Sequence, residues 1–229
     1  MLYLIGLGLD KRGISLHGKK ILKNLKKIYL ESYTVEFPYT KKELEKELKI
    51  KTILADRAFV ESEEIVDMAK KEDVALLVYG SPLSATTHIS LINKARKLKV
   101  KYKILHSGSI FDAVGETGLQ IYKFGKTTSL PAWKGNYNPT SFIDVIKDNQ
   151  KIGAHTLLLI DIGLEYNKAI EQLKETKFKF EKVIVCSQLG VKSRFFYDTL
   201  DKVDFSKVKS PYCIIIPGKL SHDEEEVLD

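Results

Sequence analysis

Short apolar runs that alternate with amphipathic stretches constrain the fold of this chain more than any other feature. Residues 2–7, 74–79 and 155–162 are largely apolar, and amphipathic segments separate runs of this kind along the chain. In residues 15–27, for example, Ile21, Leu22 and Leu25 fall on one helical face. Parallel strands joined by crossover helices have this pattern, so the sequence predicts an α/β fold.

The period of the apolar residues places the expected elements. We predict strands at residues 2–7, 28–33, 74–79, 102–106, 127–130, 155–162, 182–188 and 213–219. We predict helices at residues 15–27, 62–71, 87–99, 140–151 and 167–176. Thr40 and Glu43 have the spacing of a capping box, which predicts a further short helix after Thr40.

The regular alternation of apolar runs and amphipathic segments is interrupted in the middle of the chain, which predicts a domain junction. Gly108, Gly115, Gly118 and Gly125 interrupt the regular pattern there. A chain of 229 residues also suits two domains of roughly 100 residues each. We expect an N-terminal α/β domain at residues 1–108 and a C-terminal α/β domain at residues 109–229, with a cleft between them.

Composition narrows the class of protein. Hydrophobic residues make up 44% of the chain and charged residues 29%, a globular balance. No run reaches the ~18 apolar residues of a membrane span. The apolar N-terminus has no basic residue ahead of it and leads into a glycine turn, so we expect a strand instead of a signal peptide, and a cytoplasmic protein. Cys186 and Cys213 lie in apolar runs without metal or redox spacing, which favours core packing.

The net charge of +7 raises the question of nucleic-acid binding, because lysines neutralise phosphates. The lysines are spread along the predicted helices, and no aromatic and basic signature of an RNA-binding module accompanies them. We interpret most of them as solvated helix faces. We therefore expect no membrane partner and no direct nucleic-acid partner.

The first strand ends in a glycine-containing turn. Gly6 and Gly8 stand where glycine lets a backbone turn sharply or approach a ligand closely. A dinucleotide fingerprint needs a third glycine where this chain has Lys11, and Gly13 is too late. Phosphate binding is disfavoured, and a tight turn between a strand and a helix stays open as the alternative.

A second loop, YGSPLSATTH at residues 79–88, follows the buried run 74–79. Ligands of open α/β sheets bind beyond the carboxyl ends of strands. Pro82 restricts the turn, and the hydroxyls of the loop offer polar groups and a helix N-cap, from Ser81, Ser84, Thr86 and Thr87. The five histidines are dispersed along the chain, so we expect no metal site, and no G-x-S-x-G motif occurs.

Four segments together resemble the diphthine synthase family of the tetrapyrrole-methylase superfamily. They are IGLGLD from residue 5, PLSATTH from residue 82, SIFDAVGETGLQIYKFGK from residue 109, and PTSFIDVIKDNQKIGAHTLL from residue 139. The segment IIIPGKL from residue 214 is similar to the closing motif of that family. The segments keep their order over nearly the whole chain, and IYKFGK together with ATTH is a specific combination.

The resemblance implies S-adenosylmethionine as the cofactor, held in the cleft between two α/β domains, no metal, and a homodimer. Carried over position by position, the family's cofactor contacts fall on Leu9, Ser81, Ser84, Ser109, Ile110, Ile160 and Leu189. The family loop G-D-P-L-V is G-S-P-L-S here. The family histidine after P-G-K-L corresponds to Ser221, with His222 one residue later, so both are candidate contacts.

The implied reaction is methylation of the amine of a 3-amino-3-carboxypropyl group carried on a histidine of translation elongation factor 2. An amine with a pKa of about 8 keeps an appreciable neutral fraction near pH 7, so no strong general base is required. We assign no catalytic residue, although His88 or Tyr122 could relay a proton.

Two alternatives stay open. Another member of the superfamily would act on a tetrapyrrole or on RNA, and a degenerate paralogue would bind the cofactor without catalysis, as Ser81, Ser84 and a short C-terminus suggest. The segment from Trp133 to Tyr137 is either core packing or an aromatic surface that holds a trimethylammonium product by cation–π attraction.

Overall fold

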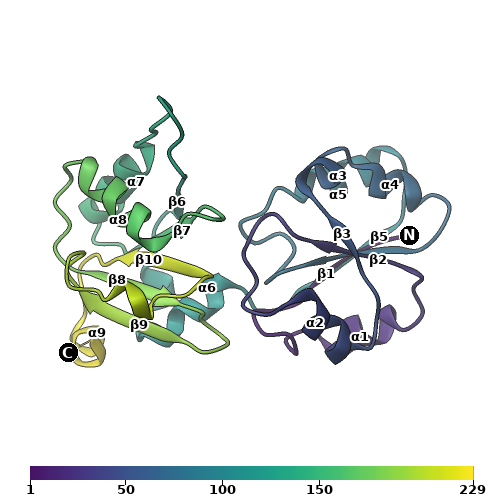
Figure 1. Ribbon diagram of the computed structural model, residues 1–229, viewed down its shortest axis with the longest axis horizontal. Helices are drawn as coiled ribbons and strands as arrows, with labels where there is room; N and C mark the ends of the chain where they lie inside the picture. The colour runs from purple at the N-terminus through teal and green to yellow at the C-terminus, as the bar shows by residue number, and fades with distance from the viewer. Residues whose placement is uncertain (229) are drawn as a thin grey trace. The chain divides into compact units, whose positions relative to one another are not determined.

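The structure is a computed structural model that describes residues 1–228. The chain forms two compact units, Met1–Phe111 and the residues from Asp112 onward (Figure 1). Helices and strands alternate in both units, which confirms the predicted α/β class. Among residues 1–228, no helix has the length and apolar character needed to cross a membrane.

A parallel sheet of five strands organises the first unit. All of its strand pairs are parallel. Leu4 lies opposite both Leu76 and Ile104, so the first strand has the fourth and fifth strands as neighbours. The strands pair in the order β3 (Ile53–Ala55), β2 (Lys27–Glu31), β4 (Val74–Val78), β1 (Leu2–Gly6) and β5 (Tyr102–Leu105). The carboxyl ends of β4, β1 and β5 therefore lie side by side at one edge.

Helices cover both faces of this sheet (Figure 1). Leu2 and Leu4 of β1 are buried in the core beneath one group of helices, while Ile5 belongs to the core beneath the other. A fully buried leucine contributes roughly 1.5–3 kcal/mol relative to an exposed one, so both faces stabilise the unit. The first group is α3 (Arg57–Glu61), α4 (Glu64–Met68) and α5 (Ile89–Lys97), and the second is α1 (Leu16–Leu22) and α2 (Lys41–Leu48).

The capping box before α2 was predicted correctly, but the end of α1 was not. The capping box is confirmed, because the Glu43 amide donates to the Thr40 hydroxyl (3.2 Å) and the Glu43 carboxylate accepts from the Thr40 amide (2.9 Å). Helix α1 ends at Leu22 and not at residue 27, because Lys27 already pairs with Val74 as the start of β2.

The helix predicted at residues 62–71 is also different. It is replaced by α3 and α4, with a break at Glu63, whose φ of +58° is left-handed. Left-handed geometry cannot continue a right-handed helix. Strand β3 was not predicted, because it has only three residues and its apolar residues Ile53 and Leu54 are exposed.

The second unit has a mixed sheet of five strands. Its order is β6 (Thr128–Leu130), β7 (Thr156–Ile160), β10 (Tyr212–Ile216), β8 (Val183–Ser187) and β9 (Arg194–Asp198). β10 is antiparallel to β7 and β8, and β9 is antiparallel to β8. The expectation of parallel strands holds for the pair of β6 and β7 and is wrong for the pairs that involve β10 and β9. Residues 188–193 are too few for the crossover of roughly a dozen residues that a parallel partner of β8 requires.

The helices α7 (Ser141–Lys151) and α8 (Tyr166–Glu175) pack on one face of this sheet, around Phe142, Ile146, Leu158 and Ile214. Cys186 and Cys213 lie opposite each other on β8 and β10 and are buried, which confirms the predicted core packing. The remaining short elements are α6 (Ile110–Ala113), α9 (His222–Leu228), and the 3-10 turns η1 (Val114–Thr117), η2 (Ile121–Lys123) and η3 (Phe205–Lys207).

Candidate functional site

Three loops of the first unit meet at the edge where β1, β4 and β5 end. Gly8 and Gly80 exchange two backbone hydrogen bonds of 3.1 and 3.0 Å. A Cβ atom added to Gly6 would lie 2.6 Å from the Gly80 carbonyl oxygen and 3.1 Å from Cβ of Ser107. Real Cβ atoms do not approach other atoms as closely as 2.6 Å, so glycine is required where these loops touch.

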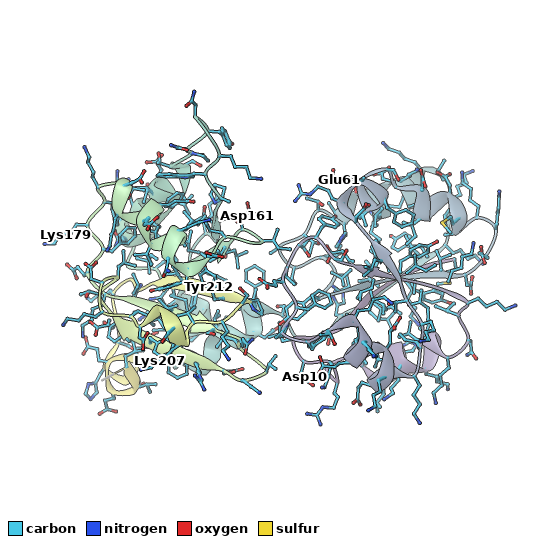
Figure 2. The ribbon with its side chains drawn as sticks, viewed as in Figure 1. Asp10, Glu61, Asp161, Lys179, Lys207 and Tyr212 are labelled. Atoms are coloured by element: carbon cyan, nitrogen blue, oxygen red, sulfur yellow. The ribbon has the colours of Figure 1, made fainter. Side chains whose placement is uncertain are left out.

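The first loop, after β1, is a tight turn stabilised by its own backbone. Gly8 has a φ of +70°, and a Cβ added to it would lie 2.9 Å from Cα of Gly13. The Gly13 amide donates to the Asp10 carbonyl (2.8 Å), and the Ser107 hydroxyl of the third loop donates to the Gly13 carbonyl (2.7 Å). Leu9 is half-buried in this turn, next to Asp10, which Figure 2 labels. The glycines serve close packing between two segments of backbone.

The second loop connects β4 to α5. Ser81 is buried, and its hydroxyl is hydrogen-bonded to Nδ1 of His106 at 3.2 Å. The Ser84 amide donates to the Ser81 carbonyl (3.0 Å), which closes a turn around Pro82. The expectation that a hydroxyl of this loop caps α5 is wrong. The N-cap residue is His88, without a side-chain cap bond, because the Thr86 hydroxyl donates to the Pro82 carbonyl instead.

The third loop, after β5, carries Ser109 and Ile110. Ser109 is buried and Ile110 is half-buried at the start of α6. The Cα atom of Ser109 lies 3.7 Å from the position of a Cβ on Gly80, so the second and third loops are in van der Waals contact. Beside Gly108 no atom lies within 4 Å of an added Cβ, which leaves open space at this edge. The structure thus brings together the loops that hold five of the candidate residues, Leu9, Ser81, Ser84, Ser109 and Ile110.

Two further candidates share one edge of the second sheet. Ile160 is the last residue of β7, and Leu189 follows β8 and is buried. Because both strands are antiparallel to β10, they run in the same direction and end at the same edge. Asp161, which Figure 2 labels, directly follows β7. Its carboxylate accepts hydrogen bonds from the amides of Ala132 (3.2 Å) and Ile162 (3.0 Å).

Ser221 and His222 lie at the opposite edge of that sheet. They follow β10, whose last residue, Ile216, pairs with Thr156 at the beginning of β7. Five residues of strand at about 3.3 Å each separate the two edges by more than ~13 Å. The hydroxyl and amide of Ser221 donate to the Glu224 carboxylate at the start of α9, and the His222 side chain is 83% exposed.

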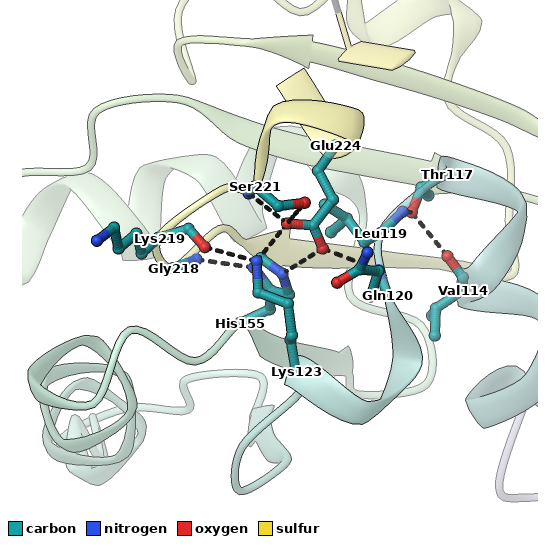
Figure 3. Close-up of polar contacts among 10 residues, drawn as sticks. All are labelled: Val114, Thr117, Leu119, Gln120, Lys123, His155, Gly218, Lys219, Ser221 and Glu224. Carbon is teal, nitrogen blue, oxygen red and sulfur yellow. Dashed lines mark hydrogen bonds and ion pairs between the residues drawn. The ribbon is translucent and has the colours of Figure 1, made fainter. Parts of the chain in front are cut away.

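The buried carboxylate of Glu224 binds several groups at this edge of the second sheet, where Ser221 lies (Figure 3). It was not predicted from the sequence. Glu224 is fully buried and pairs with Lys123 of η2. It accepts hydrogen bonds from the Gln120 amide (2.9 Å) and from Nε2 of His155 (3.1 Å). Burial raises the pKa of Glu224, but Lys123 and the hydrogen bonds lower it by more, so the pKa falls to about 2. The spacing of Ser221 and Glu224, that of a capping box, was the signal that could have revealed the carboxylate.

His155 joins two segments through both of its ring nitrogens (Figure 3). The Gly218 amide donates to Nδ1 (2.9 Å), so Nε2 carries the proton that is donated to Glu224. Burial lowers the pKa of His155 by more than Glu224 raises it. The conspicuous motif residues Lys123 and His155 therefore attach α9 to its own unit.

The two residues considered as proton relays have different surroundings. His88 is fully buried, and its Nδ1 lies 3.1 Å from the Pro82 carbonyl oxygen, while Tyr122 is 82% exposed on η2.

Within residues 1–228, no group of three or more histidine, cysteine, aspartate or glutamate side chains is arranged to hold a metal ion. The second unit also carries Trp133, whose indole N–H donates to the Pro139 carbonyl (3.2 Å), and Tyr137, which is 70% exposed.

Comparison with known proteins places this geometry in a family. The family of Tetrapyrrole (Corrin/Porphyrin) Methylases matches residues 1–204. The chain is 48% identical over 168 residues to the diphthine methyl ester synthase of Schizosaccharomyces pombe, a match that covers 72% of this chain and 59% of the relative. It is 43% identical over 186 residues to the Homo sapiens diphthine methyl ester synthase, covering 80% of this chain and 64% of the relative.

A solved structure agrees with these sequence matches. The crystal structure of a diphthine synthase superimposes with a TM-score of 0.88 at 30% identity and covers 99% of this chain and 94% of the other. The chain therefore belongs to the tetrapyrrole methylase family and, within it, to the diphthine synthase group. Its matches span about three fifths of the length of the curated relatives.

Proposed function

We propose that this protein is a methyltransferase of diphthamide biosynthesis that uses S-adenosylmethionine to methylate a modified histidine of translation elongation factor 2. The observation that carries the proposal is the meeting of three glycine-containing loops at the carboxyl edge of a parallel sheet, in a chain of the diphthine synthase group. Such an edge is where open α/β sheets bind ligands.

The residues at this edge fit the proposed cofactor. Glycine backbones approach each other closely, open space remains beside Gly108, and the hydroxyl of Ser81 is hydrogen-bonded to His106 at the end of β5. We propose Leu9, Ser81, Ser84, Ser109 and Ile110 as its contacts in the first unit, and Ile160 and Leu189 in the second. For Ser221 and His222 the local bonds of α9 favour a role in holding that helix.

When bound, the cofactor supplies a methyl group on a sulfonium, whose carbon–sulfur bond breaks as a bond to the acceptor forms. The chain's own residues orient the acceptor in line with that bond and exclude water from it. An amine acceptor loses its proton readily, because its reference pKa is about 8. The relatives are named for a methyl ester, so we extend the proposal to the carboxylate of the same side chain. A carboxylate is already ionised at neutral pH and needs no base.

The decisive experiment weighs the product. The protein is incubated with S-adenosylmethionine and elongation factor 2 that bears the 3-amino-3-carboxypropyl histidine, and the methyl groups are counted by mass spectrometry. We expect added methyl groups, of which mild alkali removes one if an ester has formed and none if only the amine is methylated. Factor with the unmodified histidine is the control and should gain none. If the precursor also gains none, the proposed activity is excluded.

A binding experiment tests the cofactor site separately. Calorimetry with S-adenosylmethionine or its demethylated product should show one site per chain. Ser81→Asp restores the residue of the family motif and should tighten binding by about 1.5–3 kcal/mol through a charge-assisted hydrogen bond. Absence of binding by the unaltered protein at millimolar ligand would favour the degenerate paralogue. An unchanged affinity for Ser81→Asp would remove Ser81 from the site.

The remaining parts of the proposal concern partners and location. We propose a homodimer on family resemblance, which light scattering over a wide concentration range tests, and a cytoplasmic location beside the translation factor. RNA or a tetrapyrrole as the methyl acceptor is the rival reading. Assays with ribosomal RNA and with a tetrapyrrole in place of the protein substrate distinguish it, and methylation of either would support the rival.

A further inference from the structure

The carbonyl of Pro82 accepts two side-chain hydrogen bonds from the same loop. The Thr86 hydroxyl donates at 2.6 Å, and Nδ1 of His88 lies at 3.1 Å. Both donors belong to the ATTH segment, and Pro82 and His88 are buried. A turn within the loop needs no such pair of donors, so this doubly bonded carbonyl, which we call the Pro82 clamp, requires an explanation.

The chemistry of the clamp settles the state of His88. A carbonyl oxygen only accepts, so Nδ1 must carry a proton, and in the neutral ring Nε2 then carries none. Nε2 is buried and has no hydrogen-bond partner among residues 1–228, and the ring meets Tyr33 edge-on at 6.5 Å. Burial lowers the pKa of His88, which keeps the imidazole neutral. The bond to Pro82 is therefore the polar contact that fixes the orientation of this ring.

The clamp acts on the part of the loop that faces the other two loops. Cδ of Pro82 lies 3.1 Å from the position of a Cβ on Gly6, at the end of β1. The Ser84 amide donates to the Ser81 carbonyl across Pro82, and Ala85 has a left-handed φ of +56°. This strained conformation persists only if surrounding contacts hold it. Thr86 and His88, which follow Ala85, both bond the Pro82 carbonyl, which precedes it, and α5 begins without a side-chain cap.

We propose that His88 and Thr86 are positioning residues that hold the backbone from Ser81 to Ser84 in its ligand-binding conformation. This inference rests on the proposed cofactor site and deepens it. Neither side chain has to touch the cofactor. A loop that is already ordered loses less conformational entropy on binding, so the clamp raises affinity by preorganisation.

The test uses pairs of variants that differ in one hydrogen-bond donor. Thr86→Val removes the donor at nearly constant volume, and Thr86→Ser keeps it. His88→Leu removes the ring donor, and His88→Asn keeps an N–H near the place of Nδ1. Thr87→Val is the matched control, because Thr87 is exposed next to the clamp and does not bond Pro82.

Two measurements read the result. We expect Thr86→Val and His88→Leu to weaken binding of S-adenosylmethionine about three- to tenfold, the equivalent of one net hydrogen bond, and to raise its KM while kcat at saturation is kept. Thr86→Ser, His88→Asn and Thr87→Val should bind as the unaltered protein does. In the absence of cofactor, hydrogen exchange of the Ser84 amide should be faster in the two donor-less variants alone.

The outcomes separate this inference from the proposed function. If the unaltered protein binds no cofactor, the proposed function fails, and the exchange rate of Ser84 still reports whether the clamp orders the loop. If Thr86→Val is folded but both its Ser84 exchange and its cofactor affinity are unchanged, the positioning role is overturned. A fall in kcat with unchanged KM would also overturn it, because that result indicates direct participation in the reaction.

Discussion

The two units are built from the same alternation of strands and helices, yet they place their loops differently. In the first unit every strand pair is parallel, so the loops after β1, β4 and β5 meet at one edge. In the second unit β10 runs against β7 and β8, so the residues after it lie at the edge opposite Ile160 and Leu189. Strand direction therefore decides which candidate residues can converge.

The units also differ in the groups that hold their loops. Neutral donors and glycine backbones hold the loops of the first unit, whereas a buried ionised carboxylate holds the C-terminal helix of the second. Neutral hydrogen bonds contribute about 0.5–1.5 kcal/mol each, whereas breaking a buried charged pair costs more. The second unit should consequently be the more sensitive to a single substitution.

The largest expected effect is on Glu224. Glu224→Ala removes the acceptor for Lys123, His155 and two backbone amides, so the free energy of unfolding should fall by about 3–5 kcal/mol. Glu226→Ala is the control on the same helix. It removes only an exposed pair with His222, and its cost should stay below ~1 kcal/mol. Denaturant unfolding that gives equal values for the two variants would contradict the role of the buried carboxylate.

Glycine substitutions in the first unit should have the next largest effect. Gly6→Ala places a methyl group 2.6 Å from the Gly80 carbonyl oxygen, where only backbone can move. We expect a loss of about 1–3 kcal/mol in unfolding free energy, together with weaker cofactor binding, because the three loops must separate.

Gly108→Ala is the matched substitution at the same edge, where the new methyl group has no neighbour within 4 Å. Stability should change little. If the cofactor lies in that space, affinity measured by calorimetry should still fall. Retained stability with retained affinity would show that the space beside Gly108 is not part of the site.

The pH dependence of stability should come from one buried histidine in each unit. Burial lowers the pKa of both His88 and His155 below the ordinary value of 6.5. The unfolded chain therefore takes up a proton before the folded chain does, and stability falls as pH drops from about 7 to 5. Each histidine contributes at most ~1.4 kcal/mol per pH unit. The pKa of Glu224 is about 2, so this carboxylate adds to the loss of stability only below about pH 4.5, where the unfolded chain takes up the proton first.

Substitutions of the two histidines test whether they cause this change of unfolding free energy with pH. His155→Gln keeps an amide donor for Glu224 but does not titrate, and His88→Asn keeps a donor for Pro82. Each should flatten the dependence of unfolding free energy on pH between 7 and 5. A slope equal to that of the unaltered protein in both variants would mean that other groups produce it.

The smallest expected effect is on the products. Trp133 is half-buried with its indole N–H bonded to Pro139, and Tyr137 is exposed nearby in the chain. If Trp133 holds the trimethylammonium product, Trp133→Leu removes about 0.5–2 kcal/mol of cation–π attraction. Elongation factor 2 that carries one or two methyl groups should then accumulate while cofactor binding stays intact, as mass spectrometry would show. Normal trimethylation at the normal rate would leave Trp133 as packing.

Much of the fold could be predicted from short-range patterns. The capping box of Thr40 and Glu43 and the fully buried run of β4 depend on neighbours within a few residues, and both were predicted. Strand β9 was missed because its residues are partly exposed at a sheet edge, and α9 was missed because it is short and strongly charged. The stability of α9 comes from partners far along the chain, such as Gln120, whose amide donates to Glu224.

The sequence by itself determined the α/β class, most of the strands and helices, and the family, because these depend on local periodicity and on ordered motifs. Tertiary structure alone decided which strand ends meet, that Ser221 and His222 lie across the sheet from Ile160, and that the ATTH side chains bond the Pro82 carbonyl. Strand direction and hydrogen-bond partners are set when distant segments pack together. A motif shows which groups are present, and only the packed backbone shows which acceptor each donor reaches.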